Sequence, residues 1–285
     1  MPNDVSAAFV TQYEAEVFMA YQQGASKLRN LVRTRPGVVG SSDKFTKIGK
    51  GEATQKTRHA AVVPMDVDHS QATATLEDWY APDYVDKLDE YKIKHDERRA
   101  LTWSGAAAIG RKVDSLIIGA AGAALPAGQV MGDGTGIMTL DLVMDAFALF
   151  NEGEVPDDGQ RYAVVGPRQW NQLLLIDQFA KSDYVGTDAP VWLRGTEAKR
   201  WLNIIWLMHT GLPVTGAGTA AAYTGCYLFH KTALGLAEGG QGVVSEINYV
   251  PEKVAYLCNN MISAGAVRID DLGVVRINAL NKKAA

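Results

Sequence analysis

Residues 37–75 constrain the fold most, because this stretch holds too few apolar side chains to form a hydrophobic core of its own. It is rich in Gly, Ser, Thr and Lys, and its best strand candidates are the short runs 45–48, 59–63 and 71–76. A turn signal, Gly49-Lys50-Gly51, follows the first run. The pattern predicts an extended β-hairpin, and because an isolated hairpin is marginally stable, this one must lie on something else.

Helical periodicity flanks the hairpin on both sides. Before it, apolar residues from Val5 to Leu31 recur every three or four positions, which predicts an amphipathic helix that ends at Arg35-Pro36-Gly37. After it, the same rhythm runs from Pro82 to Ala123 and predicts a second helix, ~60 Å long at 1.5 Å per residue. A helix of that length exceeds most helices of globular domains.

From Thr139 onward the sequence predicts a compact α/β arrangement. Thr139 caps a helix that Gly153 ends, and Gly166-Pro167 opens another helix after a strand at 162–165. Residues 179–199 are expected to form an irregular loop. Further strands are predicted at 204–208, 226–229 and 243–250, one more element at 253–263, and a closing hairpin from 267–269 and 274–277.

Composition excludes several classes of protein. With 47% hydrophobic and 21% charged residues, the chain is neither disordered nor collagen-like, and its net charge of −4 provides no overall basic field for nucleic acid. Two cysteines are too few for a disulfide framework. The first twenty residues contain no Lys or Arg, unlike a signal peptide, and no apolar run reaches the ~20 residues of a membrane helix. We therefore expect an intracellular protein.

The net charge conceals two opposite blocks. Residues 27–58 hold nine basic against two acidic side chains, a net of +7, and residues 66–97 hold ten acidic against three basic, a net of −7. Such blocks can pair within one chain, pair between copies of it, or remain separately solvated faces. The residues that we select as candidate contacts are Lys44, Lys47, Lys50, Lys56, Arg58, Asp83, Asp86, Asp89 and Glu90.

A search for catalytic or ligand-binding motifs identifies no catalytic, cofactor-binding or metal-ligating residue. The glycines of 132–136 follow no predicted strand and lack the spacing of a dinucleotide or phosphate loop. Asp66-x-Asp68-His69 has no calcium-loop spacing. Cys226 lies in an apolar strand pattern and Cys258 in an apolar helical pattern, which favours structural thiols. No Gly-x-Ser-x-Gly nucleophile elbow is present.

The order of these elements resembles the major capsid proteins of tailed phages with the Hong Kong 97-type fold. The segment from Arg161 to Leu174 resembles the strand and helix of that family's axial domain. Residues 226–238 and 248–253 are similar to the stretch that returns toward the peripheral domain, and 265–277 resembles the closing hairpin. The resemblance covers nearly the whole chain.

This resemblance implies an α+β, Hong Kong 97-type capsid fold. Its parts would be an N-terminal arm at 1–36, an extended loop at 37–80, a peripheral domain with the spine helix at 81–135 and 251–285, and an α/β axial domain at 136–250. The charge blocks would then set the register between neighbouring copies.

The resemblance also implies function and partners. The chain would be a structural protein without enzymatic activity or cofactor, which self-assembles into hexamers and pentamers of an icosahedral shell around double-stranded DNA. Expected partners are other copies of the chain, a separate scaffolding protein and a portal, with no sequence-specific DNA binding and no membrane. The protein would be found in the virion after assembly in the host cytoplasm. A covalent cross-link from Lys47, Lys50 or Lys56 to Asn259 or Asn260, as in some relatives, has residues of the right types.

Two alternatives remain open from sequence. An encapsulin-like nanocompartment shell would share the fold and enclose cargo enzymes. An α/β hydrolase-type enzyme belongs to a different class, and the missing nucleophile elbow is the main argument against it.

Overall fold

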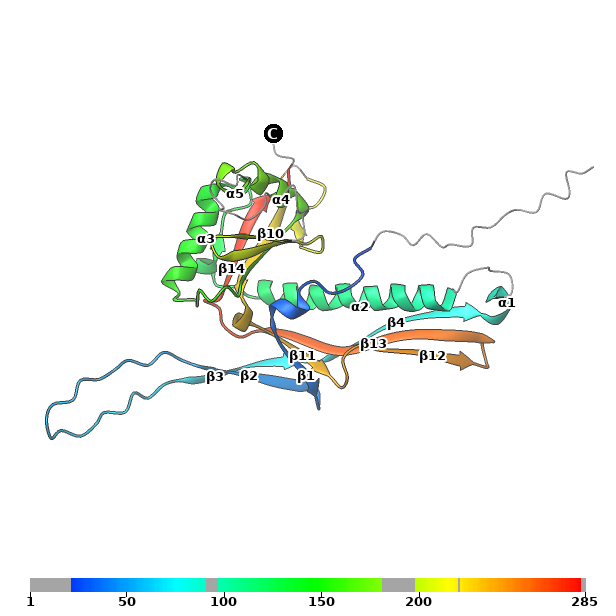
Figure 1. The fold of residues 1–285 in the computed structure, drawn as a ribbon, viewed down its shortest axis with the longest axis horizontal. Coiled ribbons are helices and arrows are strands. Elements are labelled where there is room, and N and C mark those ends of the chain that lie inside the picture. The colour runs from blue at the N-terminus through cyan, green and yellow to red at the C-terminus, as the bar shows by residue number, and fades with distance from the viewer. Residues whose placement is uncertain (1–21, 91–96, 181–197, 220, 283–285) are drawn as a thin grey trace, which may run out of the picture.

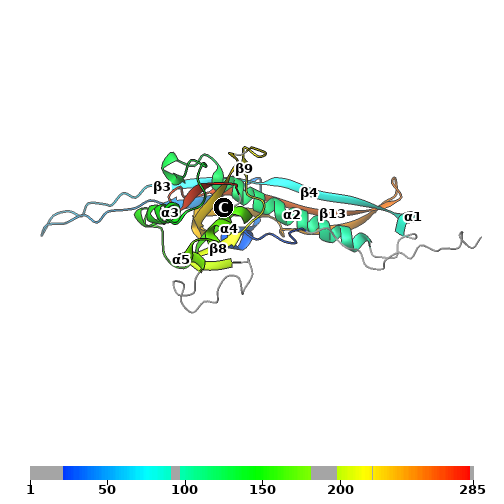
Figure 2. The ribbon, with the colours of Figure 1, turned by 90° about the horizontal axis from the view of Figure 1, so that it is seen from above.

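A computed structural model describes residues 22–90, 97–180, 198–219 and 221–282. Figure 1 shows a long twisted sheet with one helix along its face, a β-hairpin that projects from one end, and a compact α/β unit on the helix side of the sheet. Seen from above in Figure 2, the molecule is strongly elongated.

The long sheet is built around β13, which lies at its centre. Tyr256 of β13 pairs with Val85 on one side and Tyr249 on the other, so β4 and β12 flank the strand. β11 continues on the same side as β12, and β1 adds to it in parallel. The strands are β1 (Arg33–Val38), β4 (Glu77–Asp86), β11 (Leu234–Gly239), β12 (Val244–Val250) and β13 (Ala255–Arg268).

Helix α2 (Glu97–Gly122) covers one face of this sheet, and a short helix α1 (Lys87–Glu90) follows β4. The apolar residues of α2 recur every four positions, at Ile109, Val113 and Ile117, and are buried together with Ile262 of β13. The polar side chain of Asn260 is buried under α2, and both of its groups have hydrogen-bond partners. Its nitrogen donates to the Thr102 carbonyl (3.2 Å), and its oxygen accepts from Ser245 Oγ (2.5 Å). Asn260 is therefore a packing residue.

The projecting hairpin consists of β2 (Ser42–Ile48) and β3 (His69–Thr75), paired in antiparallel register from Ser42↔Thr75 to Ile48↔His69. Residues 49–68 form its tip and contain no helix or strand. In Figure 1 the tip extends far beyond the rest of the molecule.

The α/β unit contains a seven-stranded sheet in the order β5-β14-β10-β6-β8-β7, with β9 paired to β10. Its strands are β5 (Val130–Met131), β6 (Arg161–Val165), β7 (Ala198–Trp201), β8 (Ile204–Met208), β9 (Val214–Thr215), β10 (Tyr223–His230) and β14 (Val274–Leu280). Its helices are α3 (Leu140–Glu152), α4 (Pro167–Leu174) and α5 (Asp177–Ala180). Short 3₁₀ turns are η2 (Arg29–Leu31), η3 (Ala127–Gln129) and η4 (Lys231–Ala233).

An aromatic cluster forms the centre of this unit. The ring of Phe179 makes edge-on contacts with Trp170, Trp201 and Trp206, at centroid distances of 5.8, 5.2 and 6.1 Å. Edge-to-face geometry of this kind stabilises aromatic pairs beyond the burial of their area.

The chain passes between the two sheets three times, after α2, at η4 and between β13 and β14. Arg268 fixes the last of these crossings. Its guanidinium donates to the Ala121, Ala123 and Ala124 carbonyls at the end of α2 and pairs with Asp271. A cation at this position satisfies carbonyls that the helix leaves open.

Most of the expected elements are confirmed. Strands at 45–48 and 71–76 correspond to β2 and β3, and the helix capped by Thr139 corresponds to α3, where Thr139 Oγ accepts from the Leu142 N–H (3.4 Å). The strands expected at 162–165, 204–208, 226–229 and 243–250, and the helix at Gly166-Pro167, are also present.

Four expectations are wrong. The helix predicted from Pro82 begins only at Glu97, because residues 77–86 form strand β4. Residues 33–38, expected at the end of an N-terminal helix, form strand β1, while residues 1–21 of that helix lie outside the described part. Residues 59–63 form no strand, and the chain does not turn back at 49–51. The loop expected at 179–199 stays a prediction for 181–197, which lie outside the described residues, whereas its two ends belong to α5 and β7.

The C-terminal expectation is also corrected. Residues 255–263, including Cys258 of the expected helical pattern, belong to strand β13, which follows a turn at 251–254. The segments 267–269 and 274–277 form no hairpin, because β13 and β14 lie in different sheets. The expected boundary at 250 also divides both sheets, since β11 and β12 lie in the long sheet and β14 lies in the α/β unit.

Candidate interaction surfaces

The base of the hairpin is fixed to the long sheet by one buried aromatic residue. Phe45 is fully buried with Ala74 and Ala237 in a small second core. The Arg35 guanidinium lies 4.8 Å from the Phe45 ring centroid and forms an ion pair with Asp43 at 2.7 Å. These contacts place part of the basic block at the root of the hairpin rather than at its free end.

Two of the candidate lysines join the hairpin to the α/β unit. Lys47 Nζ lies 2.7 Å from an Asp270 carboxylate oxygen, and Lys50 forms an ion pair with Glu154. Both pairs border a cavity of ≈ 280 Å³ between the end of β2 and the underside of the α/β unit. Lys47 and Lys50 therefore have partners within their own chain, and the hairpin leaves the body of the molecule in a defined direction.

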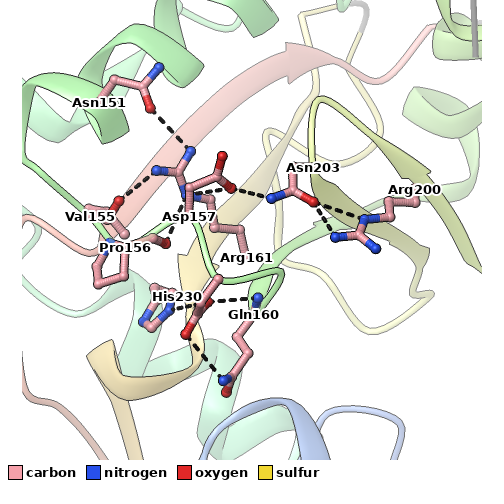
Figure 3. Close-up of polar contacts among 10 residues, drawn as sticks. Asn151, Val155, Pro156, Asp157, Gln160, Arg161, Arg200, Asn203 and His230 are labelled. Carbon is pink, nitrogen blue, oxygen red and sulfur yellow. Dashed lines mark hydrogen bonds and ion pairs between the residues drawn. The ribbon is translucent and has the colours of Figure 1, made fainter.

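The acidic side of this joint is a loop, residues 153–160, that a polar network holds in place (Figure 3). Arg161, 2% exposed, donates to the Val155 carbonyl (2.6 Å), the Pro156 carbonyl (3.2 Å) and the Asn151 side chain (3.2 Å). The planar guanidinium group presents several N–H donors in a fixed geometry, so one side chain can donate to several carbonyls at once.

The same loop is held at two further points (Figure 3). Asp157 accepts from the Asn203 amide, and the oxygen of Asn203 accepts from Arg200. The adjacent Asp158 lies 3.1 Å from His230 Nε2 and accepts from the Gln160 N–H at 2.9 Å. Hydrogen bonds from Gln160 and His230 hold the pKa of Asp158 below its usual value. The loop that carries Glu154 is thus a fixed support for the hairpin.

The free part of the hairpin carries the remaining basic candidates. The side chains of Lys44 on β2 and of Lys56 and Arg58 in the tip are exposed. Three large apolar side chains of the tip are exposed as well: Val62, Val63 and Met65. Because Asp66 and Asp68 follow on the returning limb, only the outgoing limb of the tip is basic.

The acidic candidates lie on β4 and on the short helix α1 that follows it, at the far end of the molecule from the tip (Figure 1). Asp83 and Asp86 are exposed there, together with the rings of Tyr80 and Tyr84. Asp89 and Glu90 belong to α1, and their side chains lie outside the described part. The acidic block is therefore on a strand and a short helix instead of the expected spine helix.

A buried carboxylate that the sequence search missed anchors the N-terminal segment to α2. Asp114 is fully buried and accepts from Ser26 Oγ (2.5 Å) and from the backbone N–H groups of Lys27 (3.1 Å) and Leu28 (3.0 Å). His209 Nδ1 accepts from the Gly211 N–H, so a neutral His209 carries its proton on Nε2 and donates it to Asp114 at 3.0 Å.

The protonation of Asp114 follows from these contacts. Burial alone would raise the pKa of Asp114, but the hydrogen bonds from His209, Ser26 and the two backbone N–H groups together hold it below the usual value. No local sequence pattern indicates such a cluster, because its donors come from two segments, 26–28 and His209, that are both distant from Asp114 in the sequence.

The motifs considered from sequence have no arrangement typical of catalysis. Residues 132–136 form the turn between β5 and α3, and burial raises the pKa of the Cys226 thiol to about 12. Among the described residues, no three His, Cys, Asp or Glu side chains are grouped to hold a metal ion. Within those same ranges, no helix is long and apolar enough to cross a membrane.

The projecting hairpin at one end and the acidic strand β4 at the other are two different surfaces, and pairing of two such surfaces between copies would build rings or filaments of identical subunits. The comparison with family models agrees. This chain belongs to the phage capsid protein family, whose model matches residues 5–281. It is a structural protein, the major subunit of a phage capsid, and neither the encapsulin-like shell nor the hydrolase gains support.

Solved structures of phage capsids have the same fold as this chain, which confirms the expected Hong Kong 97-type fold class. The cyanophage P-SCSP1u capsid matches with a TM-score of 0.71 and 18% identity, covering 99% of this chain and 96% of that one. The capsid of Ralstonia phage GP4 matches with a TM-score of 0.75 and 11% identity over 97% and 96% of the two chains. The structure from Mycobacterium phage Che8 matches with a TM-score of 0.71 and 15% identity, covering 94% of this chain and 97% of that one. Among curated protein sequences, none matches this chain.

Proposed function

We propose that the chain assembles head to tail into hexamers and pentamers of an icosahedral shell, with the hairpin tip of one copy lying against β4 of the next. The observation that carries this proposal is the placement of exposed Lys56 and Arg58 at one end of the molecule and exposed Asp83 and Asp86 at the other. Two different surfaces that pair between copies generate rings when the rotation closes.

The exposed apolar residues of the tip support the same contact. Val62 is 73% exposed and Tyr80 of β4 is 61% exposed, and each would be buried against a neighbouring copy. Burial of this apolar area would supply most of the affinity, since an exposed ion pair contributes only about 0.2–1 kcal/mol. The charges would set the register and the rate of encounter.

Other partners follow from the proposed role. The shell would enclose double-stranded DNA without binding it by sequence, consistent with a net charge of −4, because neutralisation of phosphates requires clustered cations. A scaffolding protein and a portal would take part in assembly in the host cytoplasm, and the chain would have no catalytic role. Within the subunit, the long sheet with α2 would form the peripheral domain and the α/β unit the axial domain.

The test is reversal of the tip charges alone, because Lys47 and Lys50 have partners within the chain. The double variant Lys56→Glu/Arg58→Glu should keep the circular dichroism spectrum of the parent and lose rings and shells in sedimentation velocity and negative-stain microscopy. Adding Asp83→Lys/Asp86→Lys should restore part of the assembly, and raised salt should slow assembly of the parent chain.

A matched control changes the net charge equally at exposed positions away from the proposed contact. Lys27→Glu/Lys282→Glu serves this purpose, since both side chains are exposed and lie outside the tip and β4. Normal shells from the tip variant, or equal loss in the control, would refute the proposed pairing.

A further inference from the structure

The N-terminal segment follows a defined path along α2 toward the beginning of that helix. Leu28 and Ser26 are bonded to Asp114, and Ser26 and Ala25 pass over Gly110. A Cβ at Gly110 would lie 2.8 Å from the Ser26 nitrogen, so only glycine permits this approach.

The path continues in the same direction up to the first described residue. Gln22 accepts from Arg111 at 2.8 Å, and its amide lies 3.5 Å from Ser104 Oγ. An added Cβ at Gly24 would lie 3.4 Å from the Trp103 ring. As the residue number falls from 28 to 24, the contact on α2 thus moves from 114 to 103, which is ~16 Å at 1.5 Å per residue.

An unfilled groove begins where this path ends. It has a volume of ≈ 660 Å³ and is lined by Arg98, Arg99, Thr102, Trp103 and Ala106 of α2 and by Ile247 of β12. Two large apolar side chains are open in it, since Trp103 is 42% and Ile247 is 47% exposed. Tyr249, further along β12, is 44% exposed.

The residues directly before Gln22 match this groove in pattern and in charge. Tyr13, Val17 and Tyr21 recur at four-residue spacing, which places them on one side of a helix. The first 21 residues carry Asp4, Glu14 and Glu16 and no Lys or Arg, whereas the groove carries Arg98 and Arg99. The segment is apolar on one side and acidic, and the groove is apolar and basic.

We propose that residues 13–21 dock as an amphipathic helix into this groove of their own subunit, with Tyr13, Val17 and Tyr21 toward Trp103 and Ile247. The same subunit is favoured because Gly24 already lies beside Trp103, so only a short stretch of chain separates residues 13–21 from the groove. The segment would then complete the cover over the open side of α2 and β12, independently of any contact between copies.

The first test is a cysteine pair, Val17→Cys/Ile247→Cys, in the full chain. Mild oxidation should link the two positions within one chain, seen as a monomer on a non-reducing gel and as a linked peptide by mass spectrometry. The native thiols do not compete, because Cys226 and Cys258 are buried. The matched pair Met19→Cys/Ile247→Cys, on the opposite side of the helix, should link far less. Links between two chains, or equal yields from both pairs, would overturn the proposal.

The second test needs no disulfide geometry. Val17→Asp should increase amide hydrogen exchange in residues 98–106 and 244–250 by about tenfold, since a docked helix protects the elements beneath it. Met19→Asp adds the same charge on the other side and should leave exchange there unchanged. Exchange in β10 of the α/β unit reports whether each variant is folded. The same exchange in both variants would overturn the proposal.

Discussion

The ring of Phe45 in β2 lies directly on the backbone of Gly235 in β11, where a Cβ would come within 2.8 Å of the ring. This contact ties the hairpin to the long sheet. We expect Phe45→Ala to cost about 3–5 kcal/mol at this site, because the large buried side chain leaves a cavity. The loss should be seen as faster amide exchange in β2 and β3, with little change in the α/β unit. Thr46→Ala, exposed on the same strand, is the control, and unchanged exchange in Phe45→Ala would contradict the expectation.

The Asp114 cluster predicts a pH dependence of stability. Since the folded-state pKa of Asp114 lies below its usual value, its contribution is complete above about pH 4 and is lost as pH falls through the lower folded-state value. Asp114→Asn should lower the free energy of unfolding at pH 7 by about 3 kcal/mol and flatten its fall in acid. Urea unfolding at several pH values measures both effects. Asp145→Asn, at an exposed position of α3, should change neither.

Lys199 is expected to destabilise the α/β unit at neutral pH. Burial lowers its pKa to about 8, and within the described residues its Nζ has no hydrogen-bond partner, although it lies 4.0 Å from the Phe179 ring centroid. The folded state therefore resists a proton that the unfolded chain binds, and stability falls as pH drops from about 10 toward 8. Lys199→Met should raise the free energy of unfolding at pH 7 by about 1–3 kcal/mol. A lower melting temperature in Lys199→Met would show that the charge is compensated.

Both thiols should be inert in the folded protein. Only the thiolate reacts with a disulfide reagent, and the pKa of Cys226, raised by burial to about 12, leaves almost none at pH 8. Cys258 is 1% exposed. We expect no reaction with dithionitrobenzoate until the protein is unfolded, and then reaction of both. Lys56→Cys supplies an exposed thiol as a positive control, and rapid labelling of the parent chain would contradict this view.

The α/β unit could be predicted from sequence because its signals are local. Thr139, Gly153 and Gly166-Pro167 mark helix ends by their own backbone and side-chain chemistry, whatever the chain does elsewhere. The long sheet could not be predicted in the same way. In the long sheet, Arg33 of β1 pairs with Gly235 of β11, and no pattern in residues 33–38 indicates so distant a partner.

In strand β4, the four-residue spacing of apolar residues predicts a helix where the chain forms a strand. Tyr84 and Leu88 fit a helical rhythm, yet Trp79, Ala81 and Val85 are the residues turned toward the protein, at the spacing of a strand. In β13 the polar Asn259 and Asn260 interrupt the apolar pattern, and Asn260 is tolerated only because Thr102 and Ser245 satisfy it. Lys47 and Lys50 can be selected as candidate contacts from the sequence. Their partners Asp270 and Glu154 cannot, because both lie in distant turns with no distinguishing pattern.

The tip of the hairpin, residues 49–68, sets the kinetics of the proposed assembly. Fixing one backbone residue in a single conformation costs about 1–2 kcal/mol of conformational entropy. When a neighbouring copy orders the tip, this cost offsets much of the favourable free energy of the first contact. An open row of subunits always leaves one tip without a neighbour, whereas a closed ring leaves none. Partial rings are therefore the least stable species, and shells should form after a lag whose length falls steeply with protein concentration.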